Sequence, residues 1–172
     1  MTTIQRIVFI GFRATGKSNI AKRVAERLGW QLYSIDALLE EHFGEPISSF
    51  VAREGWQAFR RAEAEQVRQL SALSSCIIDC GGGIVEQDDI VKCIIHNAFV
   101  VHVTADIETI IARLERKGNR PLLSANNIHD DVRENFARRK PLYERYAHCV
   151  IDTSARTKEQ AVEELLVLLS AL

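Results

Sequence analysis

An eight-residue motif near the N-terminus constrains the fold of this chain more than any other feature. Residues 11–18 read Gly-Phe-Arg-Ala-Thr-Gly-Lys-Ser, which matches the G-x-x-x-x-G-K-[ST] pattern at every fixed position. The run 7–10 before it has the β-branched and aromatic composition of a buried strand, and 19–28 carries apolar residues at helical spacing. A strand, a glycine-containing loop and a helix in this order form a phosphate-binding unit of an α/β protein.

The fixed positions of this motif each have a mechanical role in holding a nucleotide. The glycines let successive backbone N–H groups turn toward phosphate oxygens, Lys17 reaches the β- and γ-phosphates, and the Ser18 hydroxyl ligates Mg²⁺. The predicted nucleotide contacts within the loop and the start of the helix are Gly11, Ala14, Thr15, Gly16, Lys17, Ser18 and Asn19.

Length and charge limit what else the chain can be. Its 172 residues suffice for one well-filled core, so we expect residues 1–172 to form one domain. The 22 basic and 23 acidic side chains give a net charge of -1, which argues against a nucleic-acid or anionic-membrane binder. No apolar run reaches the roughly 20 residues that cross a bilayer, and no signal peptide pattern opens the chain, so we expect a cytoplasmic protein.

Short apolar runs alternate with longer segments of helical periodicity. Strands are predicted at 7–10, 31–35, 76–79, 99–103 and 149–152, and helices at 16–28, 37–43, 56–73, 88–95, 107–116, 129–146 and 158–169. This alternation predicts an α/β fold, a five-stranded parallel sheet in a three-layer α/β/α sandwich, with ligands at the carboxyl ends of the strands.

The rest of the sequence discriminates among classes of phosphate-loop protein. A switch GTPase reads guanine with an N-K-x-D segment, and the segment after 99–103 is Thr-Ala-Asp-Ile instead. Residues 115–127 are basic, interrupted by glycine and proline, and lie between two predicted helices. We interpret this segment as a mobile lid, which a kinase uses to exclude water and to bring a cation to the transferring group.

Six motifs in order carry a resemblance to a known family. They are the loop 11–18, Asp36, Phe59-Arg60, Gly81-Gly82-Gly83, the lid residues 120–123 (Arg-Pro-Leu-Leu) and residues 139–143 (Arg-Lys-Pro-Leu-Tyr). In this arrangement the chain resembles the shikimate kinases, over almost its whole length. The resemblance implies a monomeric enzyme with a nucleoside-monophosphate-kinase-like fold that uses ATP and Mg²⁺ to phosphorylate the 3-hydroxyl of shikimate in aromatic amino-acid biosynthesis.

The resemblance also implies how the acceptor is held, in a substrate-binding helical segment at about 36–62 and beyond it. Arg60 and Arg139 match the clamp for the shikimate carboxylate, which planar guanidinium groups grip in a bidentate manner. The motif selects them over their neighbours Arg61 and Arg138. The glycines at 81–83 match a platform for the substrate hydroxyl, since glycine permits close approach and positive φ.

The remaining roles concern phosphoryl transfer. Asp36 matches the aspartate that orients the acceptor hydroxyl and accepts its proton, and an N-cap role for a helix at 37–43 is a compatible alternative. Lys17 and Arg120 are expected to stabilise the transferring phosphoryl group from opposite sides. Arg113 matches a residue that stacks on adenine, although it also reads as an ordinary exposed helix arginine.

Two departures from the family pattern concern the metal and the loop. Ser34 stands where the family has the first aspartate of Asp-x-Asp, which helps to hold Mg²⁺, while Asp79 follows an apolar strand as a Walker B aspartate does. We hypothesise that Asp79 joins Ser18 at the metal; hydrogen bonding to loop amides is the alternative. Ala14 stands where the family commonly has glycine, which is tolerable if φ there is negative and costly if it is positive.

Two rival functions stay open on the sequence. One keeps the fold and changes the acceptor to a related hydroxylated acid such as gluconate or an aminated shikimate. The other is a non-catalytic paralogue that binds nucleotide or a partner protein, which Ser34 and Ala14 motivate. Turnover with ATP, Mg²⁺ and shikimate separates these alternatives.

Overall fold

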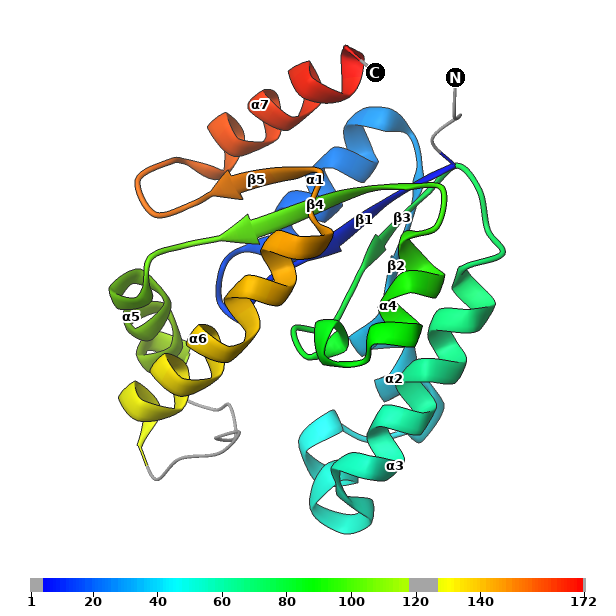
Figure 1. Cartoon of the computed structure of the whole chain (residues 1–172), viewed down its shortest axis with the longest axis vertical. Helices are drawn as coiled ribbons and strands as arrows, with labels where there is room; N and C mark the ends of the chain where they lie inside the picture. Colours follow the sequence, from blue (N-terminus) through cyan, green and yellow to red (C-terminus); the bar gives the residue numbers. More distant parts are fainter. Residues whose placement is uncertain (1–4, 118–126, 172) are drawn as a thin grey trace.

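A five-stranded parallel sheet forms the centre of the molecule (Figure 1). The structure is a computed structural model, and it describes residues 5–117 and 127–171. The strand order is β2-β3-β1-β4-β5. The strands are β1 (Arg6–Ile10), β2 (Gln31–Ser34), β3 (Cys76–Asp79), β4 (Ala98–Thr104) and β5 (Cys149–Asp152). All four neighbouring pairs are parallel, which confirms the predicted fold class.

Helices cover both faces of this sheet. They are α1 (Lys17–Leu28), α2 (Ile35–Phe43), α3 (Ile47–Leu70), α4 (Asp88–Ile95), α5 (Ile107–Lys117), α6 (Ile128–Tyr146) and α7 (Lys158–Ser170), with a short 3₁₀ helix, η1 (Ile84–Glu86). Apolar residues of α1 and α7 form one core cluster with one face of the sheet. Those of α2 to α6 form a second cluster on the other face, so the three-layer sandwich is confirmed.

The central strand β1 shows how the sequence specifies both layers. All five of its residues are buried, as expected for a parallel strand covered on both faces. Ile7 and Phe9 point into the cluster of α1 and α7, whereas Val8 and Ile10 point into the other. The strand that leads into the phosphate loop is therefore packed between the two core clusters.

The predicted boundaries hold where an apolar run is compact and shift where turn residues interrupt it. The bounds of β3, β5 and α4 are as predicted. Helix α3 begins nine residues earlier than predicted, at Ile47 in place of position 56, because Pro46 provides its N-cap. Gly55 has φ 82° and ψ 164°, so α3 consists of two helical pieces joined at a kink. The sequence pattern predicts the second piece alone and places the start of the helix there.

Helix α2 corrects the local prediction for Asp36. The helix begins at Ile35, and its N-cap is Ser34, whose side chain accepts a hydrogen bond from the Ala37 backbone N–H. Asp36 lies in the first turn, where its negative charge interacts favourably with the positive end of the helix dipole. The N-cap role considered for Asp36 is therefore wrong, and Asp36 lines the pocket described below.

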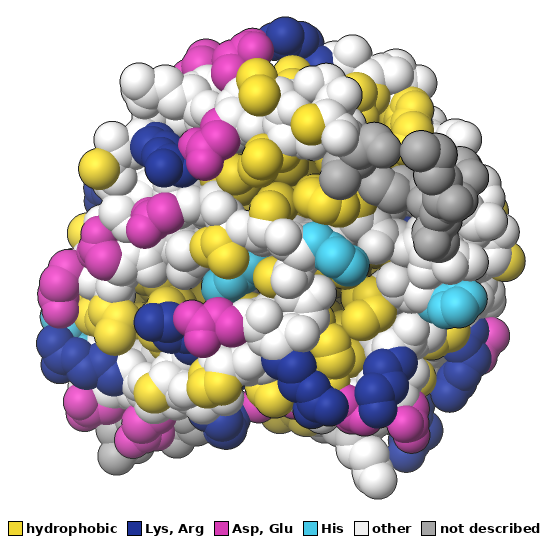
Figure 2. All heavy atoms as spheres, turned by 45° about the horizontal axis from the view of Figure 1, so that its top comes forward, with side chains coloured by type: hydrophobic (Ala, Val, Ile, Leu, Met, Phe, Trp, Pro, Cys, Tyr) yellow, Lys and Arg dark blue, Asp and Glu magenta, His cyan; other side chains and the backbone are white. Residues whose placement is uncertain are grey.

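Surface features agree with the balanced composition. Acidic and basic side chains are interspersed on the face shown in Figure 2, around apolar side chains near its middle. Within residues 5–117 and 127–171, none of the helices combines the length and the apolar character that crossing a membrane requires.

Candidate active site

The phosphate loop connects β1 to α1 and contains two positions that only glycine satisfies. Gly11 has φ 148°, and a Cβ there would lie 2.1 Å from the Val103 carbonyl oxygen of β4. Gly16 has φ 90° and is the N-cap of α1. Because both glycines are needed to turn the chain at the helix N-terminus, the loop presents its backbone N–H groups where an anion binds.

Ala14 is the strained residue of this loop. Its φ is 62°, in the left-handed region that glycine adopts at no steric cost. The sequence left the sign of φ open, and the structure shows the costly alternative. The departure from the family pattern is therefore a local strain within the nucleotide loop.

Thr153, which follows β5, and Arg113 of α5 brace the loop from outside. The Thr153 hydroxyl donates to the Thr15 carbonyl at 2.7 Å, and the Thr15 hydroxyl donates to the Phe12 carbonyl at 2.9 Å. Arg113 of α5 donates to the Ala14 carbonyl at 3.1 Å and to the Thr153 carbonyl at 2.8 Å. Arg113 is thus a partly buried brace of the loop, and the interpretation as an ordinary exposed arginine is wrong.

Lys17 and Asp79 meet directly at the end of the loop. Lys17, in the first turn of α1, donates to Oδ1 of Asp79, the last residue of β3, in an ion pair. Asp79 is 4% exposed. Ser18 and Asn19 follow Lys17 and are exposed, so their side chains are accessible from solvent.

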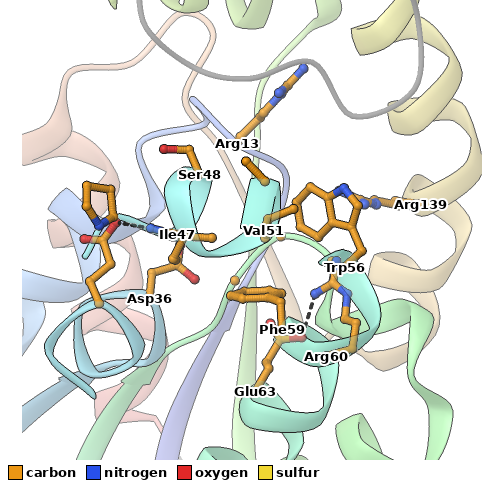
Figure 3. A pocket seen from close by; sticks show the side chains of 16 residues that line it. Arg13, Asp36, Ile47, Ser48, Val51, Trp56, Phe59, Arg60, Glu63 and Arg139 are labelled. Carbon is orange, nitrogen blue, oxygen red and sulfur yellow. Dashed lines mark hydrogen bonds and ion pairs between the residues drawn. The ribbon is translucent and has the colours of Figure 1, made fainter. Parts of the chain in front are cut away.

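A pocket of about 600 Å³ opens beside the loop, at the carboxyl ends of β1 and β3 (Figure 3). Its walls come from the phosphate loop, α2, α3, the glycine triplet and α6. The lining residues are Arg13, Asp36, Glu40, Pro46, Ile47, Ser48, Val51, Ala52, Trp56, Phe59, Arg60, Glu63, Gly81, Gly82, Gly83 and Arg139. Six residues predicted to contact the acceptor, from four separate parts of the sequence, therefore line one cavity.

The glycine triplet is required for space and not for positive φ, contrary to one of our expectations. None of its three residues is among the positive-φ glycines. A Cβ on Gly81 would lie 2.9 Å from Oδ1 of Asp36 and 3.0 Å from Oε1 of Glu63. A Cβ on Gly83 would lie 2.1 Å from the Arg60 guanidinium. The triplet lets two carboxyl groups and an arginine approach the backbone at the pocket floor.

Both clamp arginines are held in place by carboxylates. Arg60 pairs with Glu63, from its Nη1 to Oε2 at 2.6 Å. Arg139 is 6% exposed and donates to Oε2 of Glu86 from Nε at 3.0 Å and from Nη2 at 2.8 Å. The neighbouring Arg138 has a side chain that is 55% exposed, so the motif selected the inward member of that pair.

Known shikimate kinases are similar to this chain in sequence and in fold. A family model described as shikimate kinase matches residues 13–170 of the chain. The chain belongs to the shikimate kinase family. The shikimate kinase of Pelotomaculum thermopropionicum is 34% identical over 163 residues, which cover 95% of this chain and 94% of that protein. That of Thermodesulfovibrio yellowstonii is 32% identical with the same coverage.

A solved shikimate kinase confirms the fold of this family member. The enzyme of Acinetobacter baumannii, in complex with shikimate, has a TM-score of 0.91 and 26% identity, and the match covers 99% of this chain and 95% of that one. The predicted lid, about 115–127, lies largely outside the described residues, and Arg120 lies there too.

The sequence pattern of this shikimate kinase family member did not reveal the two acids that pair with the clamp arginines, Glu63 and Glu86. Glu63 is fully buried, and desolvation by burial raises its pKa, with the nearby Asp36 adding to the effect. Gln87 donates to its Oε2 at 2.7 Å. Burial alone would raise the pKa of Glu86, but its interactions with Arg139 and Arg138 outweigh burial, so the pKa is lowered. Helical spacing offered one signal: Glu63 lies three residues after Arg60 on the same helix face.

Helix α6 carries a buried polar stripe that the sequence pattern hid. Asp131, Asn135, Arg139 and Tyr143 follow one another at intervals of four residues, and all four are buried. Asp131 pairs with Arg13 of the phosphate loop, and Tyr143 donates its hydroxyl to the Gly82 carbonyl. One face of one helix thus contacts both the nucleotide loop and the glycine triplet.

Proposed function

We propose that this protein transfers the γ-phosphoryl group of ATP to the 3-hydroxyl of shikimate, as its family does. The observation that carries this is the shared cavity: the phosphate loop, two tethered arginines and the Asp36 carboxylate all border one pocket of about 600 Å³. A cavity of this size suits a small acceptor, and its cations suit an acceptor that bears a carboxylate.

The acceptor is held by charge and by close backbone approach. Arg60 and Arg139 bind its carboxylate, and each is pre-oriented by an acid that leaves other guanidinium N–H groups for the ligand. Asp36 and the backbone of Gly81 lie side by side, so Asp36 orients the acceptor hydroxyl at the platform and accepts its proton as transfer proceeds.

Phosphoryl transfer relies on positioning and on cations. The loop from Gly11 to Asn19 cradles the phosphates, Lys17 reaches the β- and γ-phosphates, and Arg113 stacks on adenine while it braces the loop. Arg120, which lies outside the described residues, stays a prediction from the resemblance, as the lid cation that stabilises the transferring group.

Mg²⁺ is the metal expected with ATP, and the residues present fit it. Ser18 offers a hydroxyl oxygen beside Lys17, and carboxylate and hydroxyl oxygens are ligands that Mg²⁺ prefers. Within the described part of the chain, no three His, Cys, Asp or Glu side chains group as a metal site. A Mg²⁺ that keeps most of its waters needs no such group. When bound with the help of the Ser18 hydroxyl, it would neutralise negative charge on the phosphates.

The broader setting follows the family resemblance. We expect a monomer of the cytoplasm that acts in aromatic amino-acid biosynthesis and has the two substrates as its partners. Gel filtration with light scattering tests the oligomeric state directly.

A coupled assay for ADP with ATP, Mg²⁺ and shikimate tests the function. Arg139→Met should raise KM for shikimate by about 10- to 100-fold, since a hydrogen-bonded charge contributes about 1.5–3 kcal/mol. Arg133→Met, on the same helix, is the matched control and should stay within about twofold because that side chain is mostly exposed and lies outside the pocket lining. Folded protein that forms no ADP with shikimate would favour a non-catalytic paralogue, and turnover with gluconate or an aminated shikimate alone would favour the altered acceptor.

A further inference from the structure

We propose that Asp79 is the carboxylate that supports Mg²⁺ at the nucleotide site, and that it makes nucleotide binding dependent on the metal. This rests on the proposed function, because it assumes that the phosphate loop holds a nucleotide. Two observations carry it: the Lys17–Asp79 ion pair and the burial of the Asp79 side chain.

Binding of a nucleotide at the phosphate loop must break the ion pair between Lys17 and Asp79. The side chains of Lys17 and Asp79 are only 11% and 4% exposed, so each charge depends on the other. Lys17 is the loop cation that reaches the β- and γ-phosphates. Once its ammonium turns to them, Asp79 loses the only partner that the described residues provide.

An unpartnered Asp79 would then oppose the nucleotide. A buried carboxylate without a cation is costly, and here a polyphosphate anion would lie next to it. A divalent cation held by the Ser18 hydroxyl and the Asp79 carboxylate would remove both penalties, because its charge would offset that of the carboxylate and that of the phosphates. The same carboxylate therefore weakens the binding of metal-free nucleotide and strengthens the binding of its magnesium complex.

The pairing of β2 with β3 allows the carboxylate to be placed on the neighbouring strand by substitution. Asp79 pairs with Phe9 of β1 on one side, directly before the phosphate loop, and with Ser34 of β2 on the other. An aspartate at position 34 would thus lie beside position 79 at the same level of the sheet. Aspartate is also a good N-cap, so Ser34→Asp preserves the start of α2.

Titration calorimetry with ADP, in EDTA and again in excess MgCl₂, tests the proposal without relying on turnover. Relative to the wild type, Asp79→Asn should bind ADP about tenfold more tightly in EDTA and about tenfold more weakly in excess MgCl₂, so the enhancement that Mg²⁺ gives should fall about 100-fold. The matched control is Asp89→Asn, an exposed aspartate in the first turn of α4, which should match the wild type in both buffers. In Ser34→Asp/Asp79→Asn, a large part of the Mg²⁺ enhancement should return.

Each outcome separates this inference from the proposed function. If the wild type binds no ADP in either buffer, the proposed function fails as well. If the wild type shows Mg²⁺-enhanced binding and Asp79→Asn retains the same enhancement, the function stands and the role of Asp79 is wrong. Weaker binding by Asp79→Asn in both buffers also overturns it, as that is the signature of a structural role. Should Asp79→Asn not fold, Asp79→Ser with the same two titrations and a circular-dichroism check takes its place.

Discussion

His102 predicts a steep loss of stability in mild acid. It lies on β4, is 2% exposed, and neither ring nitrogen has a hydrogen-bond partner among the described residues. Its ring stacks on that of Tyr143 at 5.0 Å between centroids. Burial, with a smaller contribution from the charge of Lys140, lowers the pKa of His102 from 6.5 to about 4.

The sign and the size follow from this difference. Above pH 6.5 the ring is neutral in both the folded and the unfolded chain, so His102 adds no pH dependence. Between pH 6.5 and 4 the unfolded chain takes up a proton that the folded protein does not, and each pH unit lowers the free energy of unfolding by about 1.4 kcal/mol. At pH 4.5 the accumulated loss in the free energy of unfolding is about 2.5 kcal/mol. This is a large share of the total for a typical domain, which is about 5–15 kcal/mol.

The assay is urea unfolding at pH 7 and pH 4.5, followed by circular dichroism. The wild type should lose about 2.5 kcal/mol more than His102→Phe between the two pH values, because phenylalanine keeps the ring against Tyr143 and cannot titrate. His96→Gln, at an exposed histidine, should behave as the wild type does. An equal loss in His102→Phe and the wild type would show that the buried ring is not the acid-sensitive group.

Two further predictions concern the loop and the glycine triplet. Ala14→Gly should raise the free energy of unfolding by about 1 kcal/mol, because glycine relieves the strain of the left-handed φ. The control Ala112→Gly, in the interior of α5, should lower the free energy of unfolding by about the same amount. If both variants have a lower free energy of unfolding in the same urea assay, Ala14 is not strained. Tyr143→Phe removes the hydroxyl that holds the Gly82 carbonyl and should lower kcat by about tenfold with KM for ATP unchanged. Steady-state kinetics that show KM for ATP rising with kcat intact would contradict that positioning role.

The sequence predicted the fold well because the signals of strands and helices are local. Strand β3 is a compact apolar run that ends in Asp79, so its bounds could be read directly. The first part of α3 was missed because Gly55 interrupts the helical pattern with a kink, which no periodicity reveals. The predicted helix start at position 56 was therefore the second of two helical pieces.

Contacts between distant residues were beyond the reach of pattern analysis. Arg13 and Asp131 are 118 positions apart, and each alone reads as an ordinary surface charge. Glu86 orients Arg139, although the two residues are 53 positions apart in the sequence. The sign of φ at Ala14 depends on the path of the backbone between β1 and α1, so only the structure could decide it.

The spacing of the polar stripe along α6 sets the distance between the nucleotide loop and the glycine triplet. From Asp131 to Tyr143 the helix rises about 18 Å in twelve steps of about 1.5 Å, and the stripe contacts Arg13 at one end and Gly82 at the other. A single inserted or deleted residue between these two positions would turn one end relative to the other by about 100° and separate the nucleotide loop from the acceptor clamp. Length variation in natural or engineered variants should therefore be confined to the segments before Asn127 and after Tyr146, while the exposed positions of α6 accept substitution freely.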